Sequence, residues 1–386
     1  MIKNLPAAGA FALIAFIIGL NLRPVMAAIG PLFSLLHQDM QLSGTQLSLL
    51  TTLPVFMMGA AALAGPSLIN RLGEVRGIAL GLLILMLSCL TRGMIHSVVA
   101  LIMSALVAGM GIGLIQSMMP ALIKRRYGNK AGTLMALFST GIMAGAAMAA
   151  VTATPLADTL GLQGALVVPF VPALLALLIW KTRLQGEKTL KRETLPRPRL
   201  PRQATLLMIF FGIGTGAYTL VLAWLPPFYI QHGWSPRLSG YLLGALTLTE
   251  VVAGFVLSST IHYFQDRRRP LVVVLCLILA GLVCLIMLGG AHAWLPTLLL
   301  GLGIGALFPL SLIVTLDHAK TPEEAGLLLS FVQGGGYMIA SLMPLIAGIV
   351  RDHADSLNSA WGVMCAGIVM LILIAVRFTP PPAARA

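Results

Sequence analysis

Long apolar runs recur along this chain, and each is bounded by charged residues or by Pro, Gly and Asn. A helix needs about 20 mostly apolar residues to cross about 30 Å of hydrocarbon. Twelve runs meet that length: 8–33, 45–69, 77–95, 99–122, 131–154, 162–180, 205–230, 239–262, 271–289, 295–316, 325–349 and 359–378. Backbone groups within lipid must satisfy their own hydrogen bonds, which predicts helices rather than open strands. The pattern predicts an all-α integral membrane protein with twelve transmembrane helices.

The composition agrees with this pattern. Of the 386 residues, 58% are hydrophobic and 10% are charged, whereas soluble domains carry about 25% charged residues. A soluble enzyme and a nucleic-acid-binding domain are therefore excluded. The first run resembles a signal peptide at its start, but it continues past the usual 7–15 apolar residues and has no clear cleavage site, so we expect a retained first span.

The net charge of +13 is distributed very unevenly between the predicted connections. The termini and the even-numbered connections hold 21 of the 25 Lys and Arg residues, and the opposite side holds Arg92, Arg237 and Arg351. By the positive-inside rule both termini are cytoplasmic. We expect a multi-pass protein of the bacterial inner (plasma) membrane, in contact with lipid and with no nucleic-acid partner.

The chain reads as two six-helix halves, 1–180 and 205–386, joined by a cytoplasmic linker at 181–204 that is rich in Pro, Lys and Arg. Leu42-Ser43-Gly44 recurs as Leu238-Ser239-Gly240, at an offset of 196. Gly109, Gly111 and Gly113 recur as Gly301, Gly303 and Gly305, at an offset of 192. These repeats indicate a parallel duplication, which is typical of transporters. Because the glycines lie within membrane helices, we interpret them as helix-packing residues rather than a nucleotide-binding loop.

The loop after the second span reads Gly65-x-x-x-x-Asn70-Arg71-x-Gly73-Glu74-x-Arg76, and its second copy contains Asp266-Arg267. This pattern resembles, loosely, the loop 2–3 signature of major facilitator superfamily transporters, with Asn70 where that family usually has Asp. The resemblance covers essentially the whole chain and implies a cytoplasmic gate. We assign to it Asn70, Arg71, Arg76, Asp266, Arg267, Asp317 and His318.

More narrowly, the chain is similar to the cyanate permease branch of this superfamily, which itself resembles nitroimidazole exporters. The residues that carry this similarity follow one order along the chain: Asn21-Leu22-Arg23-Pro24, Gly30-Pro31, Gly113-x-x-Gln116, Pro120-x-x-x-Lys124-Arg125-Arg126, Ala223-Trp224-Leu225-Pro226, Leu316-Asp317-His318 and Gln333-Gly334.

Arg23 lies near the middle of the first span, and an ionisable residue there is a functional candidate because it is costly to insert. Pro24 follows it and predicts a kink. Asn21 and Arg23 supply several donors, and a guanidinium offers paired donors to an anion. We expect Arg23 and Asn21 to bind an anionic substrate. The alternative is that Arg23 joins two helices through backbone carbonyls.

Glu250 is the second charged residue that lies clearly within a span. If it shares a cavity with Arg23, an arriving anion would compete for Arg23, and the carboxylate left without its partner would take up a proton. This is a hypothesis of proton-coupled transport. The alternative is a Glu250 bonded to the hydroxyl of Thr247 or Thr249.

Five further polar or aromatic residues are candidate substrate contacts. Gln116 follows the first glycine run and can both donate and accept hydrogen bonds. The others lie in the seventh and eleventh spans: Tyr218, Trp224, Gln333 and Tyr337. For the residues of the seventh and eleventh spans, packing or anchoring at the membrane interface is the alternative.

The sequence therefore predicts a secondary active transporter that moves a small, cyanate-like anion by alternating access, with proton co-transport as a further hypothesis, and that acts as a monomer. One alternative is an exporter of small nitro-heterocyclic or drug-like compounds. Another is a non-transporting membrane sensor or scaffold, which would need an output domain. We expect neither an enzyme nor a cofactor or metal, because no catalytic triad, Walker loop or metal-ligand spacing is present.

Overall fold

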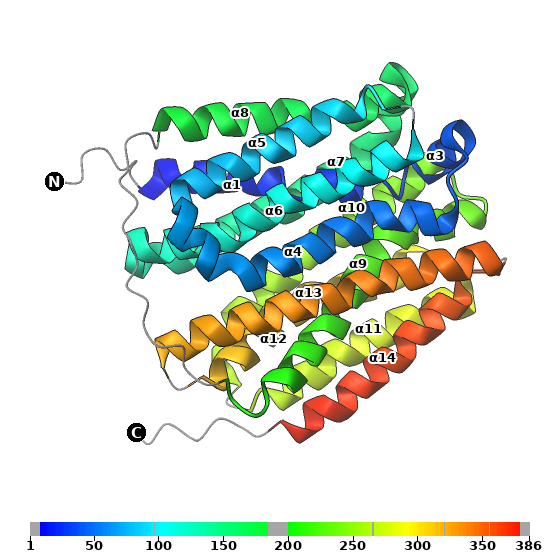
Figure 1. Cartoon of the computed structure of the whole chain (residues 1–386). Coiled ribbons are helices and arrows are strands. Elements are labelled where there is room, and N and C mark those ends of the chain that lie inside the picture. Colours follow the sequence, from blue (N-terminus) through cyan, green and yellow to red (C-terminus); the bar gives the residue numbers. More distant parts are fainter. Residues whose placement is uncertain are drawn as a thin grey trace.

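The computed structural model describes residues 8–95, 97–183, 200–264, 266–319, 321–354 and 356–378. These residues form α-helices and two short 3-10 helices, with no strand among them, so the predicted all-α fold is confirmed (Figure 1). The elements are α1 (Ala8–Leu20), α2 (Pro24–Ala27), α3 (Phe33–Met40), α4 (Gly44–Leu72), α5 (Glu74–Arg92), α6 (Val98–Tyr127), η1 (Gly128–Lys130), α7 (Ala131–Val167), α8 (Phe170–Arg183), α9 (Ala204–Gln231), α10 (Pro236–Thr260), η2 (Ile261–Tyr263), α11 (Arg268–Leu288), α12 (Trp294–Asp317), α13 (Pro322–His353) and α14 (Asn358–Arg377).

Within the described ranges, 11 stretches are long and apolar enough to cross a membrane. The remaining predicted span, 162–180, consists of two pieces. Helix α7 passes a kink at Gly161, whose φ of 73° favours glycine, and continues to Val167. Helix α8 begins at Phe170, just after Pro169, which lacks the amide hydrogen that a continuous helix would need.

The first span also differs from its prediction. The apolar run 8–33 predicted one helix, but α1 ends at Leu20, the short α2 follows, and residues 28–32 form turns before α3. Pro24 is the first residue of α2. The helix is interrupted where proline removes a backbone donor.

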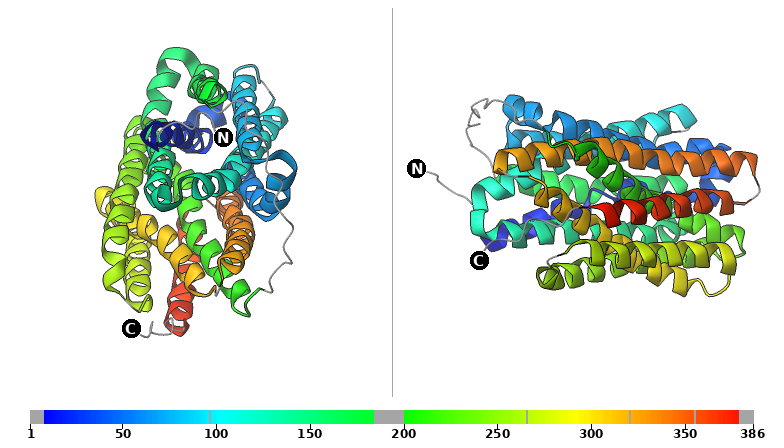
Figure 2. Two further views of the ribbon diagram at one scale, coloured as in Figure 1. Left: turned by 90° about the vertical axis from the view of Figure 1, so that its left-hand side faces the viewer. Right: turned by 90° about the horizontal axis from the view of Figure 1, so that it is seen from below.

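The helices form one bundle in which the first six spans lie beside the last six (Figures 1 and 2). Helix α4 packs against α13, and α7 packs against α10. We call the end at which α1 begins and α14 ends the inner end, and the opposite one the outer end. Most of the predicted linker 181–204 lies outside the described residues, since 184–199 are not described.

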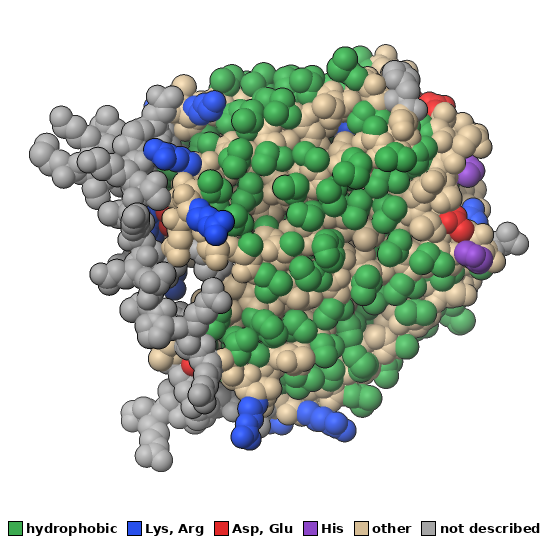
Figure 3. Space-filling view, viewed as in Figure 1, with side chains coloured by type: hydrophobic (Ala, Val, Ile, Leu, Met, Phe, Trp, Pro, Cys, Tyr) green, Lys and Arg blue, Asp and Glu red, His purple; other side chains and the backbone are tan. Residues whose placement is uncertain are grey.

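The surface is apolar around the middle of the bundle (Figure 3). Large apolar side chains lie exposed on the membrane-spanning helices, among them Leu87, Met103, Met287 and Leu373. Lys and Arg side chains gather toward the inner end of the face shown, whereas Asp, Glu and His appear at the outer end. This is the surface of a protein whose solvent is lipid around its middle.

The two halves repeat each other in their helix starts. Ser43 caps α4 by accepting a hydrogen bond from the backbone N–H of Gln46, and Ser235 caps α10 in the same way through Leu238. These caps satisfy amide groups that a helix start leaves free. The two serines lie 192 positions apart.

The glycine runs repeat their packing in the same register. Gly109 lies against Pro54 of α4, and Gly301 lies against Leu246 of α10. Both glycines and both partners are 192 positions apart. This supports the predicted helix-packing role of the glycine runs. It also corrects the offset of 196 that the repeat of Leu42-Ser43-Gly44 suggested: the offset from packing is four residues smaller, which is about one helical turn.

The corrected register pairs Met58 with Glu250. A Cβ on Gly113 would lie 3.3 Å from the Met58 Cα, and Gly305 lies directly against the Glu250 backbone. Met58 and Glu250 therefore occupy equivalent places on α4 and α10. A glycine of α6 packs against Met58, and a glycine of α12 packs against Glu250.

Candidate functional site

The break in the first span positions Arg23. The N–H groups of Asn21 and Leu22 close turns on the carbonyls of Ile18 and Gly19, at 3.1 and 3.0 Å. Arg23 is the residue before α2, and its side chain makes no capping bond there. Its guanidinium is therefore available to reach into the interior of the bundle.

Close packing against α7 holds the end of α1. The Gly145 Cα lies against the Leu20 carbonyl, and Gly141 lies against the Phe16 carbonyl, so closely that a Cβ would not fit at either glycine. Small residues permit such backbone approach in membrane helices. The residues just before the break are thus fixed from this side.

Arg23 is 5% exposed and lies between the two halves. One terminal nitrogen, Nη1, points to the Met58 sulfur at 3.5 Å. The guanidinium carbon lies 5.4 Å from the centre of the Tyr218 ring, a cation–π arrangement. Tyr337 of α13 also interacts with Arg23. The Arg23 Nε has no hydrogen-bond partner among the described residues.

Glu250 on α10 is buried, and Arg23 is the charged group that acts on it. Neither of its carboxylate oxygens has a hydrogen-bond partner in the described part of the chain. The hydroxyls of Thr247 and Thr249 instead donate to the carbonyls of Leu243 and Ala245 on their own helix. The structure thus places Glu250 in the field of Arg23 rather than on a neighbouring hydroxyl.

Other predicted contacts leave polar atoms open in the interior. The Asn21 amide donates to the Ile17 carbonyl at 2.7 Å, which leaves its Oδ1 unpartnered. The Gln116 Oε1 and the Tyr218 hydroxyl also lack partners among the residues described. Buried polar atoms are almost always satisfied in proteins, so such a group of open ones suits a polar ligand.

Trp224 has a different environment from Tyr218. Its indole N–H donates to the Pro344 carbonyl of α13 at 3.0 Å, and its ring packs against Phe33 at 5.6 Å. This makes Trp224 a link between α9 and α13. Tyr337 is buried with its ring edge-on to Phe211 at 5.4 Å, and Gln333 is half-buried one turn earlier.

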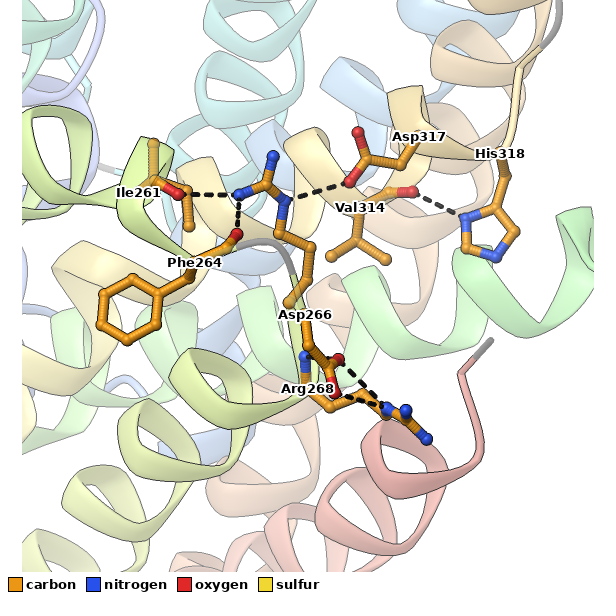
Figure 4. Close-up of polar contacts among 8 residues, drawn as sticks. Ile261, Phe264, Asp266, Arg268, Val314, Asp317 and His318 are labelled. Atoms are coloured by element: carbon orange, nitrogen blue, oxygen red, sulfur yellow. Dashed lines mark hydrogen bonds and ion pairs between the residues drawn. The ribbon is translucent and has the colours of Figure 1, made fainter. Parts of the chain in front are cut away.

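The predicted cytoplasmic gate residues of the second half form ion pairs (Figure 4). The Arg267 Nε lies 3.2 Å from Asp317, and its Nη1 donates to the Ile261 carbonyl at 2.7 Å. Asp266 accepts hydrogen bonds from the side chain and the backbone N–H of Arg268, and these bonds hold its pKa below the usual value. The His318 ring contacts the Val314 carbonyl of its own helix, not Asp317.

In the first half, Glu74 pairs with Arg125 at 2.7 Å. Asn70, Arg71 and Arg76 lie at the inner ends of α4 and α5, and their side chains make no hydrogen bond or ion pair with the described residues. The ion pairs Glu74–Arg125, Arg267–Asp317 and Asp266–Arg268 each lie within one half.

Two residues with a clear structural role were missed by the sequence. Arg92 was counted among the residues of the outer side, and the structure adds that it is 2% exposed and donates to the Val25 carbonyl at 3.1 Å. Asp352 on α13 accepts hydrogen bonds from backbone N–H groups at the start of α4. An exposed ion pair, Asp158–Arg237, joins α7 to α10 at 2.8 Å.

Comparison with known proteins agrees with this geometry. Residues 10–322 match the family model described as Major Facilitator Superfamily. The chain is 36% identical over 373 residues to the cyanate transport protein CynX of Escherichia coli (strain K12), with 95% of this chain and 97% of that protein covered. It is 30% identical over 372 residues to the 2-nitroimidazole transporter of the same organism, with 94% and 92% covered.

Solved structures show the same fold at low sequence identity. The inward-open conformation of the xylose transporter XylE from E. coli superimposes with a TM-score of 0.80 at 14% identity, covering 97% of both chains. The nucleoside transporter NupG superimposes with a TM-score of 0.73 at 10% identity, covering 95% of this chain and 99% of that one.

Proposed function

The chain belongs to the major facilitator superfamily and is a membrane transporter, and we propose that its substrate is a small anion such as cyanate. The observation that carries this proposal is the buried Arg23, whose charge has no bonded carboxylate among the described residues and whose Nε is unpartnered. A guanidinium supplies paired donors to a small anion, and it remains charged at any physiological pH. The relative named as a cyanate transport protein supports the choice of anion.

The anion site we propose lies between the halves. Arg23 supplies the charge, Tyr218 and Tyr337 line it from α9 and α13, and Asn21 and Gln116 supply further polar atoms. Movement of the halves 1–180 and 205–386 around this site would expose it to one side at a time. We place the protein in the bacterial inner membrane with both termini in the cytoplasm, from the bias of its Lys and Arg residues.

The conformation supports access from the inner end. Asp352 and the Asp158–Arg237 pair join the two halves at the outer end. Toward the inner end, Glu74–Arg125 and Arg267–Asp317 each tie helices of the same half. The contacts between the halves at the outer end favour access to the site from the cytoplasm.

Proton coupling is the finer part of the proposal. In the empty site the Arg23 charge stabilises the Glu250 carboxylate. An anion bound to Arg23 neutralises that charge, and a buried carboxylate without a counter-charge takes up a proton. Binding of the anion and of the proton would then favour each other, as linkage requires.

Uptake of radiolabelled cyanate into proteoliposomes with an imposed proton gradient tests the proposal. Wild type should accumulate the anion, Arg23→Lys should retain a weak activity, and Arg23→Ala should lose it. Arg377→Ala is the matched control, because Arg377 is an exposed arginine in the last turn of α14. Cyanate uptake by Arg23→Ala at the wild-type rate would contradict the anion site.

Neutral 2-nitroimidazole in the same vesicles tests the alternative, export of nitro-heterocyclic compounds, which the second relative suggests. Transport of that compound without cyanate transport would make Tyr218 and Tyr337 walls of a pocket for aromatic substrates. Because Arg23 would then have no anion to bind, Arg23→Ala should leave 2-nitroimidazole transport largely intact.

A further inference from the structure

Arg92 is a buried charge near the outer end of α5. It is 2% exposed, and no described carboxylate pairs with it. Its Nε donates to the Ser104 hydroxyl of α6 at 3.0 Å, and its Nη1 donates to the Val25 carbonyl at 3.1 Å. A charge in a membrane protein interior is costly, so its retention calls for a role.

The break in the first span leaves the Val25 carbonyl without its usual backbone N–H donor. In a continuous helix it would accept from the N–H of Ile29. Here Ile29 donates to the Met26 carbonyl at 3.2 Å. Arg92 supplies the missing donor, and a satisfied buried carbonyl stabilises the turn that carries it.

That turn is the one that begins with Arg23. The N–H of Ala27 donates to the Arg23 carbonyl at 2.9 Å, so Arg23 is the residue at which α2, the short helix that contains Val25, starts. An arginine that fixes the Val25 carbonyl therefore fixes the direction in which the Arg23 side chain leaves the backbone.

Arg92 is itself held in place by a small network. The Ser104 hydroxyl, which accepts from Arg92, donates to the Leu101 carbonyl at 2.6 Å. The Ser88 hydroxyl donates to the Ser104 carbonyl at 2.7 Å and ties α5 to α6. The first span is thus held before its break by the glycines of α7 and after its break by Arg92.

We propose that Arg92 is a positioning residue of the anion site, which acts by holding α2 so that Arg23 extends over Tyr218. This role rests on the proposed function only in so far as Arg23 binds the anion. The orientation of Arg23 itself can be observed without any substrate.

The first test observes the Arg23 side chain by NMR in protein with ¹⁵N-labelled arginine in nanodiscs. The Tyr218 ring current should shift the Arg23 Nε–H signal, which is assigned by its loss in Arg23→Lys. Arg92→Gln should move this signal, and Ser104→Ala, which removes one support of Arg92, should move it less. Thr91→Ala is the control, because Thr91 is the exposed neighbour of Arg92 on α5 and its hydroxyl donates only to the Ser88 carbonyl of its own helix. An unmoved Arg23 signal in folded Arg92→Gln would overturn the proposal.

The second test is a double-mutant cycle on the KM for cyanate. Arg92→Gln should raise KM about tenfold with the maximal rate little changed, since small displacements of a binding group have large effects. In an Arg23→Lys background the same change should add less than about twofold, because coupled residues are not additive. Equal effects in both backgrounds would show a purely structural role. A shifted Arg23 signal in a protein that does not transport cyanate would leave the positioning role intact and reject only the proposed substrate.

Discussion

The carboxylate of Asp352 caps α4 from the opposite half of the molecule by accepting a hydrogen bond from the backbone N–H of Gly44 at 2.6 Å. Its second oxygen accepts from the N–H of Thr45 at 2.8 Å. A helix start carries unsatisfied N–H groups and a partial positive charge, both of which favour a carboxylate. This contact joins α13 to α4 at the outer end.

Asp352→Ala should open the outer end of the molecule. Loss of a helix cap costs about 1 kcal/mol, which corresponds to an approximately fivefold shift in the ratio of outer-closed to outer-open molecules. Spin labels at Gln38 and Asn358, in a background without the native cysteines, should show longer distances by pulsed electron resonance. Asp39→Ala removes an exposed acid from the same end and should leave the distances unchanged. Identical distributions in Asp352→Ala and wild type would refute the role of this cap.

Two replacements of Tyr218 should distinguish the contribution of its ring to substrate binding from that of its hydroxyl. A cation–π contact contributes about 1 kcal/mol, so Tyr218→Leu should raise the KM for cyanate about fivefold or more. Tyr218→Phe keeps the ring and should lose less. Tyr241→Leu changes a tyrosine that faces away from the bundle and serves as the control in the same uptake assay. A phenylalanine variant as defective as the leucine variant would assign the contribution to the hydroxyl instead.

Glu250→Gln should remove the dependence of cyanate uptake on the proton gradient. Glutamine is similar in size but does not titrate, so net accumulation driven by a pH gradient should fall to equilibration. Exchange of labelled for unlabelled cyanate should persist. Thr247→Ala alters a buried hydroxyl three residues away that bonds its own helix, and it should keep the wild-type pH profile. Retained accumulation in Glu250→Gln would exclude Glu250 from proton coupling.

Gly145→Ala should destabilise the protein, because its Cβ would meet the Leu20 carbonyl. Overpacking of this kind costs about 1–3 kcal/mol, and the displaced α1 should also weaken cyanate binding. Gly132 lies on the same helix with open space around it, so Gly132→Ala should be neutral or slightly stabilising. Thermal unfolding in detergent compares the two glycine variants. Equal melting temperatures would show that α1 shifts to accommodate the added Cβ without loss of stability.

The sequence predicted the fold well because membrane helices can be recognised from the length and apolarity of a run alone. Its errors fall where one residue changes the backbone path. Pro169 divides a run that remains apolar throughout, and Pro24 ends α1 although the hydropathy continues. The repeat was found from identical residues, but its register could be set only from packing. In that register Ser235, and not Ser239, is the residue equivalent to Ser43.

The central site was predicted in part. Arg23 and Glu250 were candidates because charges within apolar runs are conspicuous, and both side chains are buried in the structure. Asp352 could not be found in this way, since its partner Gly44 lies 308 positions away. The burial of Arg92 was not predicted, because an arginine at the end of an apolar run has the same sequence pattern whether it faces water or a buried carbonyl.

The equivalence of Met58 and Glu250 has an electrical consequence. The duplicated site holds one acid rather than two, so in the proposed proton-coupled cycle the empty carrier has one arginine and one carboxylate at its centre. With an anion on Arg23 and a proton on Glu250, the loaded carrier is also neutral there. Moving one elementary charge through 100 mV changes the energy by about 2.3 kcal/mol, but neither form presents such a charge. The membrane voltage should therefore neither drive nor oppose the transport cycle, and the concentration gradients of anion and proton alone would set its direction.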